Sequence, residues 1–455
     1  MEREQVQYTE HVNEKRQQLD DGYAESDNHN SKNNSTVLIK SPEEIAFLRK
    51  LNWTLLPLIF LIIFIQFCDK SALTVAAVLG IIEDTGMSGS QYSWLGSIFY
   101  LGYLVCQTQL LTKSVLFYFE YSIQVPNNYL IQRLPIGRYL GCVLVIWGIV
   151  MGATGACNTF GQLLATRFLL GLFEGVTYPC IYILLNTLYR KSEQSRCWGF
   201  VHVGTGMGTI LGVVIAYGLA HLDGVKGLRG WRWGYIVFGI ATVVVGFLTF
   251  FFLVDDTHHR LLRLTEKEKE IVQERSKDNC VVRNKEIKRE QMWEAAKEPR
   301  LWILFVVFLL NSLQNGGLIT FSALLVQGLG FSSLNSIILQ IPNGAAAAFF
   351  AMVSVLLAHK LQRNTFTAIG TTIISLLGCI FLAVIPGTPK LVGLYLSWAM
   401  TGTSSLILTL VSNNVSGYTK KVFYNAVLIV GQTFGNFIGP LIMVEDQAPT
   451  YWGGK

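Results

Sequence analysis

The sequence predicts an all-α polytopic membrane protein whose helices fall into two groups, and three observations support this fold class. Apolar residues make up 51% of the 455 residues and charged residues only 15%, and the mean hydropathy is +0.40; soluble domains carry about 25% charge. Long uncharged stretches account for the deficit, and the longest runs from 301 to 359. One long charged segment, 255–300, separates these stretches into two groups.

The positions of Gly, Pro and charged residues divide the uncharged stretches into eleven membrane spans. A bilayer core of about 30 Å requires about 20 apolar residues per helix, and the punctuating residues recur at that interval. Six spans precede the charged segment and five follow it. Their expected ranges are 55–80, 92–112, 139–157, 161–189, 198–220, 233–254, 301–326, 337–358, 365–386, 391–412 and 423–444.

The distribution of Lys and Arg predicts the orientation, because basic residues are retained on the cytosolic side of a membrane. With a cytosolic N-terminus, the inner segments hold 28 of the 36 basic residues and the outer loops hold four. We therefore expect a disordered cytosolic tail (1–50), a first bundle (51–254), a charged cytosolic linker (255–300) and a second bundle (301–455). Within the linker, 264–269 has the pattern of a capped, charged helix.

Several other classes of protein are excluded by the same sequence. The polar first 40 residues contain no signal peptide, so the first span must direct insertion. Seven of the eight cysteines lie in or beside apolar spans, which argues against a disulfide framework. No Walker loop, Ser/His/Asp order, Cys-x-x-Cys or metal-ligand spacing occurs, so we expect no enzyme activity, cofactor or metal. A net charge of +6, spread by membrane side, argues against nucleic-acid binding.

Four ionisable residues lie at membrane depth: Asp69 and Lys70 in the first span, and Arg167 and Glu174 in the fourth. Such residues cost about 2.5–3.5 kcal/mol to insert, so they are expected to pair and to be functional. At 1.5 Å per residue, Asp69 and Arg167 reach the same depth and can pair. Glu174 lies two helical turns beyond Arg167 on the same face, which leaves Lys70 for Glu174 or for an incoming anion.

The two carboxylates among apolar residues are suited to carrying protons, and Lys70 is suited to holding a carboxylate by charge. A second interpretation is a buried network that serves only stability. Stability alone is a weak reason for such a network, because apolar replacements commonly serve as well.

Five blocks of the chain carry a family resemblance. They are FCDKSAL at 67–73, YSWLGSIFYLGY at 92–103, PNNYLIQRLPIGR at 126–138, RFLLGLFEGVTYP at 167–179 and GWRW at 230–233. In this order they resemble the fungal allantoate permease family, which belongs to the anion:cation symporters of the major facilitator superfamily. The resemblance extends from about Ser41 to Tyr451 and implies two related six-helix bundles that alternate access to a site between them.

The resemblance also implies roles for individual residues. It assigns Glu174 to proton coupling, Arg167 to pairing with Asp69, and Lys70 to contact with the carboxylate of the substrate. Arg133, Gly137 and Arg138 match the cytosolic gating loop between the second and third helices, although Gln132 stands where that loop usually has Asp.

Polar residues in other spans are further candidates for contact with substrate. Asn311, Gln314 and Asn315 form a polar stretch in the seventh span, and we expect them to face the cavity. His202 in the fifth span has two interpretations, a histidine hydrogen-bonded within the bundle or a polar group that lines the cavity.

Two features depart from the family pattern. In the family the second helix continues directly into the block that begins here at Pro126, whereas 106–124 intervenes in this chain and resembles translated intron sequence. We therefore expect 106–124 to be an aberrant insertion. The chain ends at Lys455, just after a block that precedes a twelfth helix in relatives, so five helices are expected in the second bundle.

These features predict a monomeric proton-coupled transporter of the plasma membrane that imports a small organic anion of the allantoate, ureidosuccinate or nicotinate kind. Its partners are then the anion, protons and the lipid bilayer. A drug or metabolite antiporter is an alternative, but the Gly-Pro motif expected of an antiporter in the fifth span is missing from 204–212. A non-transporting product of a faulty gene model, or a transceptor, is a third possibility.

Overall fold

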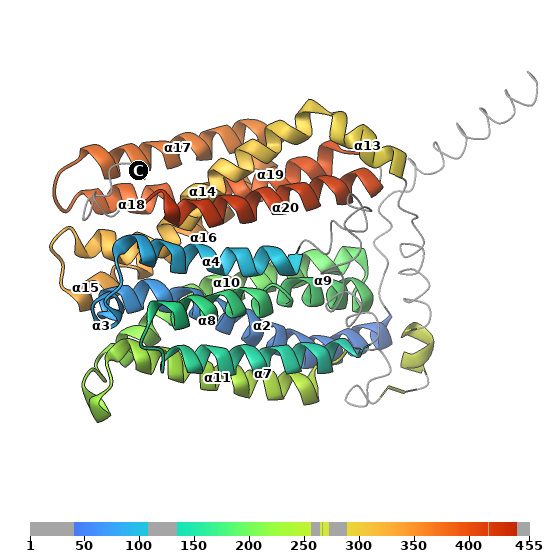
Figure 1. Ribbon diagram of the computed structural model, residues 1–455. Helices are drawn as coiled ribbons and strands as arrows, with labels where there is room; N and C mark the ends of the chain where they lie inside the picture. The colour runs from blue at the N-terminus through green and yellow to red at the C-terminus, as the bar shows by residue number, and fades with distance from the viewer. Residues whose placement is uncertain are drawn as a thin grey trace, which may run out of the picture. The chain divides into compact units, whose positions relative to one another are not determined.

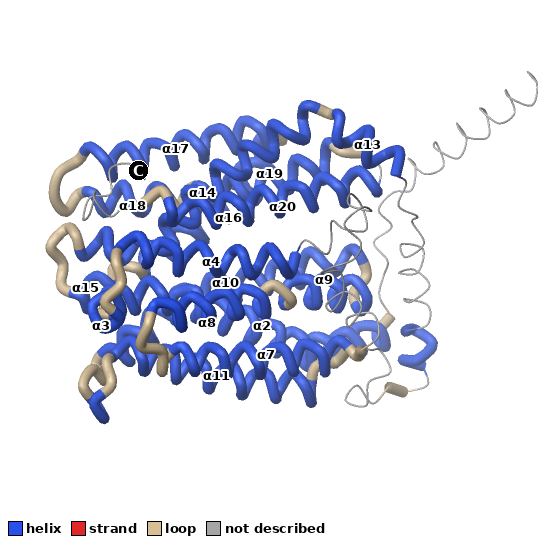
Figure 2. The backbone as a smooth tube through the Cα atoms, in the orientation of Figure 1, coloured by secondary structure: helices blue, strands red, loops and turns tan. Residues whose placement is uncertain are grey.

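The computed structural model describes residues 41–107, 134–255, 264–265, 267–272, 289–416 and 418–443 (Figure 1). The chain divides into two units, 1–49 and 50–455, and the packing described below is that of the second. The described residues form helices and connecting loops, as Figure 2 shows. The all-α prediction is therefore confirmed.

Helices of the first half are α2 (Pro42–Val78), α3 (Ile81–Thr85), α4 (Gly89–Gln107), α7 (Ile136–Thr154), α8 (Phe160–Glu174), α9 (Thr177–Leu188), α10 (Lys191–Ala220), the short η1 (Val225–Gly227) and α11 (Gly230–Phe252). After the linker helix α13 (Arg289–Lys297), the second half contains α14 (Pro299–Gln327), α15 (Ser333–Ile338), α16 (Ile341–Leu361), α17 (Asn364–Val384), α18 (Lys390–Ser397), α19 (Met400–Asn414) and α20 (Tyr418–Leu441).

Ten helices or helix pairs in the described residues are long and apolar enough to cross a membrane. The predicted span 92–112 corresponds to α4, which is not among the ten, so the prediction of eleven spans is not confirmed. The reason is composition, since α4 is rich in Gly, Ser and Tyr. It packs between α8 and α20, where such residues face protein rather than lipid.

The first helix begins earlier than the sequence predicts. Residues 42–50, placed in the disordered tail, are helical, because Pro42 occupies the first turn and Ser41 caps it. The hydroxyl of Ser41 accepts the backbone N–H of Glu44 at 3.1 Å. Residues 1–40 lie outside the described part of the chain.

Two predicted spans are each interrupted where a proline removes a backbone donor. The span 161–189 consists of α8 and α9, and Pro179 lacks the N–H that would bond to the carbonyl of Gly175 at the break. In the same way Pro342 follows the break between α15 and α16. The first break is functionally relevant because Glu174 is the last residue of α8.

The bundle has two ends, which we call the linker end and the turn end. Figure 1 shows α13 at one end, the linker end, and α3 and α15 at the other, the turn end. Within the halves the main partners are α7 with α11, α4 with α8, and α14 with α20. The halves meet where α4 packs on α20 and α10 packs on α15 and α16.

Glycines bring α4 and α8 into backbone contact beside the predicted site. A Cβ on Gly102 would lie 2.2 Å from the carbonyl oxygen of Phe168, and one on Gly171 would lie 1.9 Å from that of Phe99. Real Cβ atoms do not approach so closely, so only glycine permits this spacing. The contact places the polar face of α8 directly against α4.

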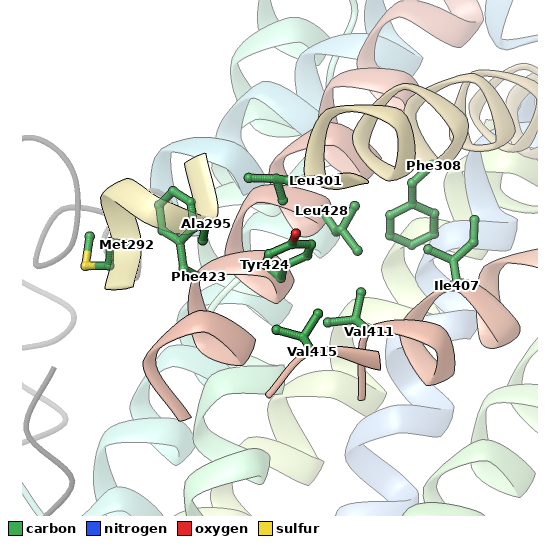
Figure 3. Packing of buried hydrophobic residues seen from close by; sticks show 10 residues of the cluster. All are labelled: Met292, Ala295, Leu301, Phe308, Ile407, Val411, Val415, Phe423, Tyr424 and Leu428. Carbon is green, nitrogen blue, oxygen red and sulfur yellow. The ribbon is translucent and has the colours of Figure 1, made fainter. Parts of the chain in front are cut away.

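The linker helix α13 is fixed to the second half by an apolar cluster and by an ion pair. Figure 3 shows Met292 and Ala295 of α13 packed with residues of α14, α19 and α20 around Tyr424. Lys420 binds Glu294 at 2.6 Å and Glu298 at 3.1 Å. Hydrogen bonds from Tyr424 and Lys420 lower the pKa of Glu298, so the Glu298 carboxylate is charged at neutral pH when it pairs with Lys420.

The first part of the linker is fixed to the first half. Thr265 and Glu268 cap a helical turn at 267–272, where the Thr265 N–H donates to Glu268 at 2.8 Å. Lys50 of α2 binds the same carboxylate at 2.8 Å. The sequence predicts a capped helix at 264–269, and the structure has a helix at 267–272 that is capped by Thr265. The linker is anchored to a different half at each of its described ends.

Candidate functional site

One cavity, which we call the charged cavity, lies between the two halves and collects the four predicted ionisable residues. Its volume is about 20 Å³, room for one or two water molecules. The first half contributes residues of α2, α4 and α8, and the second half contributes α14. The lining residues are Asp69, Lys70, Leu73, Gly96, Phe99, Tyr100, Arg167, Glu174, Ile319 and Thr320.

The carboxylate of Glu174 is the centre of the contacts in this cavity. Glu174 is fully buried, and the ammonium group of Lys70 lies 2.9 Å from its Oε1. The Nε2 of Gln66 donates to the same oxygen at 2.8 Å. Lys70 keeps a side-chain exposure of 22% and lies 4.8 Å from the ring centroid of Phe67. Of the two partners expected for Lys70, Glu174 or an incoming anion, Glu174 is the one that it contacts in this structure.

The sequence predicts that Asp69 pairs with Arg167, and for direct contact this prediction is wrong. Both residues line the charged cavity, but among the described contacts Asp69 accepts a hydrogen bond from the indole N–H of Trp147 at 2.8 Å. Arg167 instead donates to the hydroxyl of Tyr235 and lies over its ring. The two charged residues do reach the same cavity. However, the direct contact of Asp69 is with an aromatic residue of α7, and that of Arg167 is with an aromatic residue of α11.

The polar stretch of α14, which was expected to face the cavity, does not line the charged cavity. Asn311 donates to Ser404 at 2.7 Å, and Asn315 donates to Asn436 at 2.9 Å. Gln314 bonds to Ser375 at 2.9 Å and to the Ser397 carbonyl at 3.1 Å, beside the break between α18 and α19. These side chains join α14 to α17, α19 and α20, and they are not among the residues that line the charged cavity.

The remaining predicted residues are placed only in part. Arg133 and the side chain of His202 lie outside the described residues, as does most of the predicted insertion, 106–124. Arg138 is exposed at the start of α7. The N–H of Gly137 donates to the carboxylate of Asp255 at 3.2 Å, so the first residue of the linker brings an acid to the start of α7.

Three residues of the site were missed by the sequence reasoning. Gln66 is a polar residue one turn before Lys70, and its place on the same face of α2 was a usable signal. Trp147 and Tyr235 offered none, because an aromatic residue in an apolar span is indistinguishable from a packing residue until the helices are assembled.

The two halves are joined over the charged cavity at the turn end. Tyr92 donates to the carbonyl of Thr320 at 2.8 Å, and Ser93 donates to that of Met443 at 3.2 Å. The N–H of Ala323 donates to Thr74 at 3.4 Å. These three hydrogen bonds lie at the turn end and close the contact between the halves there.

Substitution of Gly96 is expected to prevent this closure. A Cβ on Gly96 would lie 2.7 Å from Oγ1 of Thr320, which itself lines the cavity. In Gly96→Val the halves cannot approach, so a reporter cysteine at Ile319 should react with an impermeant maleimide from the turn end at least about tenfold faster than in the unsubstituted background. Gly152→Val is the control, since a Cβ there meets nothing within 4 Å. An unchanged labelling rate in Gly96→Val would refute the closure.

Comparisons with known proteins agree with this fold. The Major Facilitator Superfamily model matches residues 59–440. An uncharacterized transporter of Schizosaccharomyces pombe is 34% identical, with 90% of this chain and 78% of the relative covered. The allantoate permease of Saccharomyces cerevisiae is 30% identical, with 91% and 76% covered.

Solved structures show the same fold at lower identity. A bacterial homolog of the human lysosomal transporter Spinster, in an inward-facing and occupied conformation, has a TM-score of 0.64 at 17% identity, with 85% of this chain and 80% of that chain covered. A D-xylose-proton symporter has a TM-score of 0.61 at 14% identity, with 90% and 93% covered. The chain therefore belongs to the Major Facilitator Superfamily and is a multi-pass membrane protein of a secondary-transporter family, not of an enzyme class.

Proposed function

We propose that this transporter moves a small organic monocarboxylate into the cell together with protons. The observation that supports this proposal most directly is the ion pair of Lys70 with Glu174. Both residues line the charged cavity, and the ammonium group of Lys70 lies 2.9 Å from the carboxylate of Glu174. While this pair exists, Lys70 is not available to the carboxylate of a substrate. A proton on Glu174 removes its negative charge and releases Lys70. The proton and the anion are therefore bound together and released together.

The substrate class follows from the remaining lining of the cavity. Phe99 and Tyr100 lie beside Lys70, and planar acids can stack on such rings. Allantoate and nicotinate each combine one carboxylate with a planar ureido or ring group, and ureidosuccinate has a planar ureido group with two carboxylates, either of which Lys70 can bind. The relative named allantoate permease supports this choice.

The orientation rests on the basic residues of the linker and its neighbours. Their excess assigns the linker end and the N-terminus to the cytosol. With that orientation the turn end, at which Tyr92 and Ser93 join the halves, would face outwards, and the carrier would be closed to the outside. An inward proton gradient, such as that across a plasma membrane, would drive import by rocking of the two halves.

Uptake into proteoliposomes tests the proposal. With an acidic exterior, labelled nicotinate should accumulate, and a protonophore should reduce the internal concentration to the external one. Nicotinamide has nearly the same shape without the charge, so it should neither accumulate nor compete. Allantoate and ureidosuccinate are tested in parallel. Accumulation of none of the three acids, or equal competition by nicotinamide, would contradict recognition of a carboxylate by Lys70.

A further inference from the structure

Gln66 contacts the proposed proton-carrying group as directly as Lys70 does. Its side chain is fully buried in α2, and its Nε2 lies 2.8 Å from Oε1 of Glu174. Lys70 reaches the same oxygen at 2.9 Å from one helical turn further along α2. Two donors from one face of α2 therefore converge on one of the two carboxylate oxygens.

One side-chain oxygen of Glu174 and the side-chain oxygen of Gln66 have no hydrogen-bond partner in the described structure. Oε2 of Glu174 and Oε1 of Gln66 are both buried and make no hydrogen bond there. A buried carboxylate oxygen without a donor is costly while it carries charge, and a proton on Oε2 would remove that charge from Glu174. The arrangement thus distinguishes a held oxygen from an open one.

We propose that Gln66 is a positioning residue for proton coupling, which holds Oε1 of Glu174 against Lys70 and leaves Oε2 as the oxygen that takes the proton. The inference rests on the proposed function, in which Glu174 is the group that gains and loses a proton. Its physical basis is that a hydrogen bond donated to a carboxylate favours the charged form. Gln66 therefore adds a second donor, beside Lys70, to the charged form of Glu174.

The other charged and titratable groups near Glu174 do not replace this contact. They are Asp69 and Lys70 on α2, Tyr100 and Tyr103 on α4, Arg167 on α8 and Tyr178 on α9. Among the described residues, Gln66 and Lys70 are the ones within hydrogen-bond or ion-pair distance of its carboxylate. All of these groups stay in place when Gln66 alone is changed.

The test measures the protonation of Glu174 directly. Infrared difference spectra of the purified full-length protein, titrated with and without Glu174→Gln, isolate the carbonyl band of protonated Glu174. Gln66→Leu should raise the midpoint of that titration by about one pH unit, since one hydrogen bond to a charged group is lost. Gln66→Asn, whose amide is too short to reach, should shift it in the same direction if the leucine variant does not fold.

Gln340→Leu is the matched control. Gln340 is also a buried glutamine, but it bonds to Ser336 and Asn343 at the start of α16. It should leave the midpoint unchanged. An unshifted midpoint in both Gln66 variants would overturn the assignment of Gln66. Absence of proton-driven uptake by the wild-type protein would instead overturn the proposed function, so the two failures are distinguishable.

Discussion

Glu174→Gln is expected to abolish accumulation driven by a pH gradient while exchange of internal for external substrate continues. The amide has the size of the protonated acid and cannot release a proton, so it leaves Lys70 permanently available to the anion. The carrier then works without coupling. Accumulation should fall to equality of the internal and external concentrations, and exchange should stay within a few-fold of wild type.

Both quantities are measured in the same proteoliposomes, first with an imposed gradient and then with none. Glu83→Gln is the control, because Glu83 is an exposed carboxylate on α3 outside the charged cavity. It should accumulate substrate as the wild type does. Retained pH-driven accumulation in Glu174→Gln would return Glu174 to a purely structural role.

Lys70→Ala is expected to weaken substrate binding itself, by about 100-fold or more. Removing one partner of a buried charge pair costs about 3–5 kcal/mol, and about 1.4 kcal/mol corresponds to tenfold in affinity. The dissociation constant of nicotinate, measured by calorimetry on purified protein at acidic pH, provides the check. Lys70→Arg should retain much of the affinity, because it retains the charge.

Two further variants separate loss of substrate contact from damage to the protein. Lys50→Ala removes a lysine from the same helix that pairs with Glu268 rather than facing the charged cavity, so its affinity should be unchanged. The double variant Lys70→Ala with Glu174→Gln leaves no unpaired carboxylate, yet it should still bind weakly. Recovery of affinity in the double variant would mean that Lys70 acts only by neutralising Glu174.

The sequence alone determined the membrane fold and the place of the charges along it. Hydropathy and charge patterns are set by the chain's need to match the bilayer, and they depend on no tertiary contact. Uncharged stretches of about 20 residues predicted the spans. The high insertion cost of Asp69, Lys70, Arg167 and Glu174 predicted that they would gather in one cavity, as they do.

Only the tertiary structure decided which group contacts which. Depth in the membrane is one coordinate, whereas a hydrogen bond also requires the rotation and tilt of two helices. Asp69 and Arg167 were expected at the same depth, yet their direct contacts are with Trp147 and Tyr235 on other helices. Gln314, expected in the cavity, instead faces α17 and the break in the tenth span. Helix rotation is set by packing, such as the backbone contact at Gly102 and Gly171, and no one-dimensional pattern records it.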